Sequence, residues 1–378
     1  MRKLRLTVCV MIFALLAACA PQSGEVNLPD KIPVQSPYNT ESIAQHISTS
    51  PRTPEQKTMP ISIDKNIPDI TVDSAEKANS DYTLYEDADN IYYIWSGNGL
   101  YSINKSNGKA TIIAGDCWCF TAYKGQLYFV DNTDELKQYN GIIDSIKPIV
   151  TMNKKIISLV CAGNSIYFTC SEDNDSEEYN NILFSSDLNV SNQVKLHGNV
   201  DTFCLYNNRV FSITMGELGC IQEYISDNTV NRQQLLNRSV YRNFDISLEK
   251  IICAEFKDDV FNCSNNLIYD INTGNTKDLS IAYAEYAVIG QYMIYISEDE
   301  TDGQIIIKAY DFLADKEYAL LDISDLADQY NNIEILTTRD SIYLCIENYG
   351  DHGLEMYEVI IRNGQASLEH IATIDGDA

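Results

Sequence analysis

The sequence predicts an all-β protein: a β-propeller of seven four-stranded blades, with six or eight as alternatives, behind a flexible N-terminal tether. Three observations support this. From Tyr82 onward, short aromatic and β-branched runs alternate with polar turns, one aromatic residue recurs at intervals of 38 to 47 residues, and eight of the nine prolines precede residue 69. Repeats of about 40 to 50 residues are typical of propellers.

The first eighteen residues are organised like an export signal. Arg2, Lys3 and Arg5 precede an apolar or small run from Leu6 to Ala18. This run of 13 residues is shorter than the roughly 20 that a spanning helix needs, so it predicts a signal peptide over residues 1–18.

The predicted cleavage site contains a cysteine. Leu16-Ala17-Ala18-Cys19 resembles the bacterial lipobox, in which the cysteine sulfur takes a diacylglyceryl group and becomes the new N-terminus. A plain secretory signal with a chance cysteine is the alternative. Because two or more acyl chains hold a protein firmly, the lipobox predicts anchoring through Cys19 to the extracytoplasmic face of the cell membrane.

Residues 19–75 are predicted to be a lipidated, flexible linker before a propeller domain over residues 76–378. The linker is rich in Pro, Ser, Thr, Asn and Gln and poor in aromatic residues, so it cannot bury enough apolar surface to fold alone. A short strand near 61–63 or 70–72 that docks on the propeller is compatible with this composition.

Two sets of runs are assigned to the second and third strands of each blade. The second-strand set reads Ile91-Tyr92-Tyr93, Leu127-Tyr128-Phe129, Ile166-Tyr167-Phe168, Val210-Phe211, Val260-Phe261, Met293-Ile294-Tyr295 and Ile342-Tyr343-Leu344. The third-strand set contains Tyr101, Tyr139, Phe184, Tyr224, Tyr269, Tyr310 and Tyr357. Polar turns precede the second strands, among them Lys124-Gly125, Asn207-Asn208 and Lys257-Asp258-Asp259.

Radial repetition protects the strand edges that a flat sheet would expose, which favours a closed ring over an open sandwich array or solenoid. The repeat texture, for example in residues Ile268 to Gly274, resembles the bacterial extracytoplasmic propeller lipoproteins with low-density-lipoprotein-receptor-like or TolB-like blades. The resemblance covers about residues 82–374 and implies the same fold. The receptor family's Tyr-Trp-Thr-Asp signature is missing, so no functional residue is transferred.

The charge balance excludes some partners. The chain has 27 Lys and Arg against 54 Asp and Glu, and removing the three basic residues of the signal leaves a net charge of −30. Such a charge disfavours nucleic acids and anionic membrane surfaces. A cationic partner, bound metal ions or simple solubility all fit. We expect a monomer.

The cysteines do not form an obvious disulfide framework. Nine remain besides Cys9 and Cys19, and most lie in apolar runs, which predicts small buried side chains. In Cys117-Trp118-Cys119 both thiols would lie on one face of a strand. They are either a metal or redox pair, or two core residues that flank an outward Trp118.

No catalytic residue or cofactor is predicted. His-Glu-x-x-His, Gly-x-Ser-x-Gly, Walker and Cys-x-x-Cys patterns do not occur. Acidic loops between second and third strands are expected to share one face of the disc. Two of them carry candidate Ca²⁺ ligands, which are Glu298, Glu300 and Asp302, and Asp173, Asp175 and Glu177. Both loops depart from a calcium-binding loop, and a solvated acidic rim is the alternative.

These features favour a cell-surface binding or scaffold lipoprotein that presents its acidic face to an extracellular protein or polymer. A glycan hydrolase or lyase of the cell envelope that uses two carboxylates is the enzymatic alternative. An extracytoplasmic sensor or assembly factor is the third.

Overall fold

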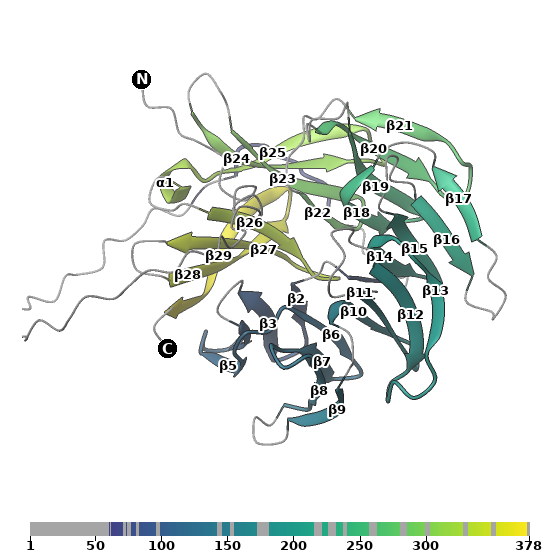
Figure 1. The fold of residues 1–378 in the computed structure, drawn as a ribbon. Coiled ribbons are helices and arrows are strands. Elements are labelled where there is room, and N and C mark those ends of the chain that lie inside the picture. Colours follow the sequence, from purple (N-terminus) through teal and green to yellow (C-terminus); the bar gives the residue numbers. More distant parts are fainter. Residues whose placement is uncertain are drawn as a thin grey trace, which may run out of the picture. The chain divides into compact units, whose positions relative to one another are not determined.

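The computed structural model describes residues 60, 62–70, 73, 77–80, 83–95, 99–141, 146–151, 155–171, 181–214, 221–225, 232–236, 240–256, 263–279, 286–298, 303–327, 332–348 and 353–375. Contacts divide the chain into residues 1–56 and 57–378, and all described residues belong to the second unit. Figure 1 shows the sheets of this unit around a common centre.

The described strands form seven antiparallel sheets, the blades, each built around four consecutive strands. Blade 1 consists of β2 (Leu84–Glu86), β3 (Asn90–Trp95), β4 (Gly99–Asn104) and β5 (Ala110–Ala114). Blade 2 consists of β6 (Cys119–Tyr123), β7 (Gln126–Val130), β8 (Glu135–Tyr139) and β9 (Lys147–Thr151). Blade 3 consists of β10 (Ile156–Ala162), β11 (Ser165–Ser171), β12 (Asn181–Asp187) and β13 (Val194–His197). Blade 4 consists of β14 (Val200–Tyr206), β15 (Arg209–Thr214), β16 (Ile221–Ile225) and β17 (Arg232–Leu236).

The remaining blades repeat this order. Blade 5 consists of β18 (Val240–Ser247), β19 (Lys250–Phe256), β20 (Cys263–Asp270) and β21 (Thr276–Leu279). Blade 6 consists of β22 (Tyr286–Ile289), β23 (Tyr292–Glu298), β24 (Ile305–Asp311) and β25 (Lys316–Asp322). Blade 7 consists of β26 (Asn332–Thr337), β27 (Ile342–Asn348), β28 (Gly353–Arg362) and β29 (Gln365–Asp375). The short helix α1 (Ser324–Ala327) lies in the chain between β25 of blade 6 and β26 of blade 7.

This architecture confirms the all-β propeller with seven blades and excludes six or eight. Each predicted third-strand aromatic lies in the third strand of its blade, from Tyr101 in β4 to Tyr357 in β28. Tight turns form where the sequence indicated them. In Lys124-Gly125 and Asn207-Asn208 both residues have positive φ, as two-residue hairpin turns require.

The predicted second strand of blade 5 at Val260-Phe261 is wrong. Ser247 pairs with Lys250, so Leu248-Glu249 form the first turn of this blade and β19 carries Ile251 and Ile252. The turn was missed because neither Leu248 nor Glu249 is a usual turn residue, although both have positive φ. Residues 257–262 fall between β19 and β20 and lie outside the described residues.

The core lies between neighbouring blades. One buried cluster joins Tyr343 and Met356 of blade 7 to Ile91 and Tyr101 of blade 1, which closes the ring. Burying a large apolar side chain contributes roughly 1.5 to 3 kcal/mol, so each seam is held mainly by packing. The seven cysteines whose surroundings are described are buried, as predicted for small core residues.

The N-terminal residues of the described unit run along the blades before blade 1 begins. Ser62 pairs with Leu321 of β25, near the expected docking strand at 61–63. Further on, β1 (Lys77–Asn79) adds a fifth strand to blade 4 by pairing with its first strand, β14. We call residues 62–70, 73 and 77–80 the strap. No helix among the described residues is long and apolar enough to cross a bilayer.

Candidate binding site

A cavity of about 280 Å³ opens beside the starts of the first strands of blades 7, 1 and 2. We call this side of the ring the entry face, and the opposite side, where first and second strands join, the turn face. The cavity is the entry-face pocket. Its described lining combines two carboxylates with three aromatic rings, Tyr93, Trp95 and Trp118, and none of its nine residues is basic.

Both carboxylates come from blade 7. Glu334 of β26 pairs with Cys345, and Glu347 of β27 pairs with Asn332. Directly paired residues point to the same face of a sheet, so Glu334 and Glu347 are diagonal neighbours on one face. Such neighbours lie roughly 7 Å apart. Two half-buried negative charges therefore line the same cavity.

Neutral donors hold Glu347 in place. The Trp95 indole N–H donates to its Oε1, and the Asn332 amide donates to its Oε2 at 3.1 Å. Trp95 stands at the end of β3 in blade 1 and is only 3% exposed, so the indole has no freedom to swing away. The contact links blades 1 and 7 and fixes the carboxylate toward the pocket.

Tyr93 of β3 is the second fixed donor. Its hydroxyl lies 3.5 Å from Glu334 Oε2. Burial, followed by the negative charge of nearby groups that include Glu334 and Glu347, raises the pKa of Tyr93. The phenol therefore stays protonated at neutral pH and remains a donor.

The Cys117-Trp118-Cys119 triplet forms another wall. Burial raises the pKa of Cys117 to about 12 and that of Cys119 well above its usual value. Both side chains are buried, Cys117 in the cluster between blades 1 and 2 and Cys119 in the cluster between blades 2 and 3, which favours their interpretation as core residues. Trp118 is partly exposed, its indole N–H donates to Ile156 O at 2.8 Å, and Lys155 Nζ lies 5.0 Å from its ring centre.

The structure tests few of the predicted site residues. Glu298 ends β23 and is exposed, whereas Glu300, Asp302, Asp173, Asp175 and Glu177 lie outside the described residues. Cys19 lies outside them as well. Within the described part of the chain no three His, Cys, Asp or Glu side chains come together as a metal site.

The sequence did not indicate Glu334, Glu347, Tyr93 or Trp95 as residues of one pocket. One signal was available, because the chain has only two tryptophans and both line this pocket. The two carboxylates reach these tryptophans only when the ring closes between blades 7 and 1, which no local pattern encodes.

No protein-family model matches the sequence, and comparison with curated proteins gives no match either. Solved structures do match. The chain is similar to an oligogalacturonate lyase from Vibrio parahaemolyticus, with 9% identity, 82% of this chain and 90% of that chain covered, and a TM-score of 0.50. It is also similar to the tricorn protease, with 10% identity and a TM-score of 0.50. That match covers 81% of this chain and 36% of that chain.

A second oligogalacturonate lyase, in complex with manganese, covers 83% of this chain and 98% of that chain at 10% identity, with a TM-score of 0.49. At 9 to 10% identity such matches show the fold alone. What the strand order and these comparisons establish together is the architecture, a seven-bladed β-propeller.

Proposed function

We propose that this protein is a lipid-anchored, extracytoplasmic binding protein whose entry-face pocket takes a cationic group of a protein or polymer partner. The observation that carries the proposal is the pocket lining. Glu347 is fixed by two neutral donors, Glu334 lies beside it, aromatic rings surround both, and none of the nine described lining residues is basic.

An ammonium or guanidinium group satisfies each part of this lining. Carboxylates give charge-assisted hydrogen bonds, which contribute about 1.5 to 3 kcal/mol each. A cation over an aromatic ring adds about 0.5 to 2 kcal/mol. Lys155 near Trp118 shows that one of these rings already attracts an ammonium group within the chain.

The volume of the pocket favours a single amino-acid side chain over an oligosaccharide. At about 280 Å³ the pocket is smaller than most sites for small molecules, which hold roughly 300 to 1,000 Å³. One lysine or arginine side chain of a larger partner fits this size. The net charge of the mature chain would also draw a cationic partner toward the surface.

The membrane attachment in this proposal rests on the sequence. Arg2 to Cys19 has the order of a lipoprotein signal, and the proline-rich residues that follow would let the propeller stand away from the bilayer. Both features suit a protein that meets its partner outside the cell.

An enzyme acting on envelope glycans is the second candidate. The specific observation in its favour is the pair Glu334 and Glu347, since two carboxylates suffice for glycoside chemistry. However, both oxygens of Glu347 accept hydrogen bonds, which suits a fixed anion better than a proton donor. Two negative groups would also repel the uronate of an oligogalacturonate.

Tryptophan fluorescence tests the proposal directly, because both tryptophans line the pocket. The mature protein would be titrated with tetralysine, with the same peptide acetylated on its side chains, and with trigalacturonate. We expect a saturable change with tetralysine alone. Glu347→Gln and Glu334→Gln should each raise its Kd about tenfold, the loss of one charge-assisted contact.

Glu369→Gln is the matched control. It makes the same change on the outermost strand of the same blade at an exposed position, so its Kd should stay within about twofold. Equal binding of the acetylated peptide would refute the cationic ligand. Cleavage of trigalacturonate that Glu347→Gln abolishes would establish the enzyme instead.

A further inference from the structure

The strap connects the two faces of the ring. Ile63 N donates to Leu320 O and Asp64 N to Ala319 O, both on the outermost strand of blade 6, and Ile67 N donates to Gly364 O in blade 7. Tyr292 and Gln291 then donate to Pro68 O and Asp69 O near the first turn of blade 6. The strap therefore starts at the rim and reaches the turn face.

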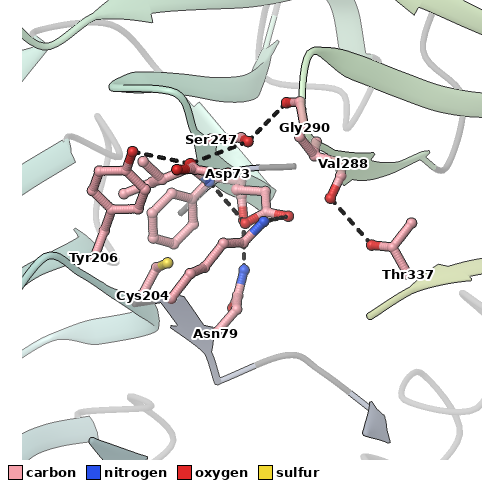
Figure 2. Close-up of polar contacts among 12 residues, drawn as sticks. Asp73, Asn79, Cys204, Tyr206, Ser247, Val288, Gly290 and Thr337 are labelled. Carbon is pink, nitrogen blue, oxygen red and sulfur yellow. Dashed lines mark hydrogen bonds and ion pairs between the residues drawn. The ribbon is translucent and has the colours of Figure 1, made fainter. Parts of the chain in front are cut away.

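Asp73 is the hub of the strap on the turn face. Its Oδ2 accepts from Leu248 N at 2.6 Å and from the Tyr206 hydroxyl at 3.0 Å. Figure 2 shows Asp73 between Tyr206 and Ser247, and Ser247 linked onward to Gly290. One carboxylate of the strap thus joins the turns of blades 4 and 5.

The turn that Asp73 holds is strained. Leu248 and Glu249 have φ of 49° and 57°, a conformation that costs such residues about 1 to 2 kcal/mol each. Asp73 accepts from the N–H of Leu248, and the Tyr206 hydroxyl accepts from that of Glu249 at 3.0 Å. Docking of the strap therefore stabilises a turn whose two residues would otherwise favour negative φ.

Beyond Asp73 the strap occupies the ring centre. Lys77 forms an ion pair with Asp245 of β18 at 2.8 Å, and the Asn79 amide donates to Phe244 O at 2.9 Å. Ser80 N donates to Phe203 O, and its hydroxyl lies 2.9 Å from that of Thr202. Because β1 runs antiparallel to β14, these contacts lead from the turn face to the entry face.

The chain next enters the pocket. Thr83, three residues beyond the strap, lines the cavity, and its carbonyl accepts from Ile94 N at 2.9 Å, beside Trp95. Between the turn face and the entry face the strap runs beside β14, which has seven residues and is roughly 20 Å long. One continuous segment thus joins a strained turn on one face to the pocket on the other.

We propose that the strap is a conformational coupling device: docking of Asp73 on the turn of blade 5 fixes the entry-face pocket, and filling of the pocket tightens the strap. Coupling between two sites is reciprocal, so each event must favour the other by the same factor. The device would let a partner at the pocket change the state of the N-terminal segment that leads to the tether. It does not depend on the charge of the ligand.

The test removes the hydrogen bonds of Asp73 and measures the effect on both the strap and the pocket. Asp73→Ala and the milder Asp73→Asn would be studied in the full mature protein by hydrogen exchange of residues 77–80 and by acrylamide quenching of the two tryptophans. In Asp73→Ala we expect exchange of residues 77–80 to accelerate at least tenfold and the quenching constant to rise about twofold. Asp73→Asn, which keeps an acceptor oxygen, should give intermediate values of both.

Asp270→Asn is the matched control, because Asp270 also accepts from turn N–H groups in blade 5 but touches no described strap residue. It should leave both readings unchanged. Exchange of β11 in blade 3 must stay native, which separates release of the strap from unfolding. Faster strap exchange with unchanged quenching would refute the coupling, and unchanged strap exchange in both variants would refute Asp73 as the hub. Neither result bears on whether the pocket binds a cation.

Discussion

Asp245 at the ring centre and Glu347 in the entry-face pocket are carboxylates with different partners. Asp245 faces the ammonium of Lys77, which the strap brings to it. Glu347 receives hydrogen bonds from an indole and an amide, both neutral. Asp245, which links the strap to blade 5, therefore has a counter-charge among its described partners. Glu347 links blades 7 and 1 through neutral donors and also lines a cavity, so these donors position its carboxylate without neutralising it, as expected of a ligand-binding group.

The largest effect should follow from breaking the central pair. Lys77→Met leaves Asp245 buried without its ammonium, and removal of one partner of a buried pair costs about 3 kcal/mol or more. Urea unfolding would measure the loss. Lys250→Met is the control, since its pair with Asp270 is more exposed and should cost less than about 1 kcal/mol. Equal losses in the two variants would show that the central pair has no special role.

A second substitution tests the contact between the start of the strap and blade 7. A Cβ at Gly364 would lie 2.8 Å from Asn66 Cα, so Gly364→Ala must push the strap away from blade 7. Gly125→Ala is closely matched, because Gly125 occupies the same place in a two-residue turn at φ +73°, against +77°, with no atom nearby. Both variants pay for positive φ, about 1 to 2 kcal/mol.

The difference between these two glycine variants isolates the strap contact. We expect Gly364→Ala to cost about 1 to 3 kcal/mol more than Gly125→Ala in urea unfolding, the usual cost of overpacking. Hydrogen exchange should accelerate in residues 62–67 in the first variant only. Identical unfolding free energies would show that the strap contributes nothing at blade 7.

Substitution of the pocket carboxylate Glu347 should change the free energy of unfolding less than substitution of Asp245. Glu347→Gln keeps the shape and an acceptor for Trp95 or Asn332, so we expect the free energy of unfolding to change by less than about 1 kcal/mol. Asp245→Asn, the same chemical change at the ring centre, should cost about 3 kcal/mol, because it also removes one partner of the buried pair. A larger loss in Glu347→Gln than in Asp245→Asn would assign Glu347 to the structure rather than to a ligand.

The repeat can be predicted from the sequence, but the contacts between repeats cannot. Turn residues such as Asn207-Asn208 and the third-strand aromatics are local signals, so blade number and most strands could be predicted. The turn at Leu248-Glu249 could not, because it is held by Asp73, which lies 175 residues away in sequence from Leu248.

The pocket could not be predicted from the sequence for the same reason. Trp95 and Glu347 are 252 residues apart and meet only when the last blade packs on the first. The rarity of tryptophan was a usable hint, but it carried no information about which carboxylates would lie beside it.

The smallest expected effect is on the acid titration of Asp270, a partly exposed carboxylate that serves as a reference for the two carboxylates compared above. A hydrogen bond from Lys250, followed by one from the Thr273 N–H, lowers the pKa of Asp270 to about 2 from its usual 3.8. The folded state therefore favours the carboxylate. Its contribution to stability is complete above about pH 4 and is lost as the pH falls toward 2.

Because both side chains of this pair are partly exposed, screening by water should limit its contribution to less than about 1 kcal/mol. Thermal unfolding of the native protein and of Asp270→Asn should therefore differ slightly at pH 6 and converge only as the pH falls to about 2. Lys250→Met should give the same convergence, since it removes the donor rather than the acceptor. A gap that persisted at low pH would mean that the turn hydrogen bonds, and not the ion pair, carry the effect. In that case Lys250→Met would not isolate an ion pair, and the loss of roughly 3 kcal/mol expected for Lys77→Met would need a different control.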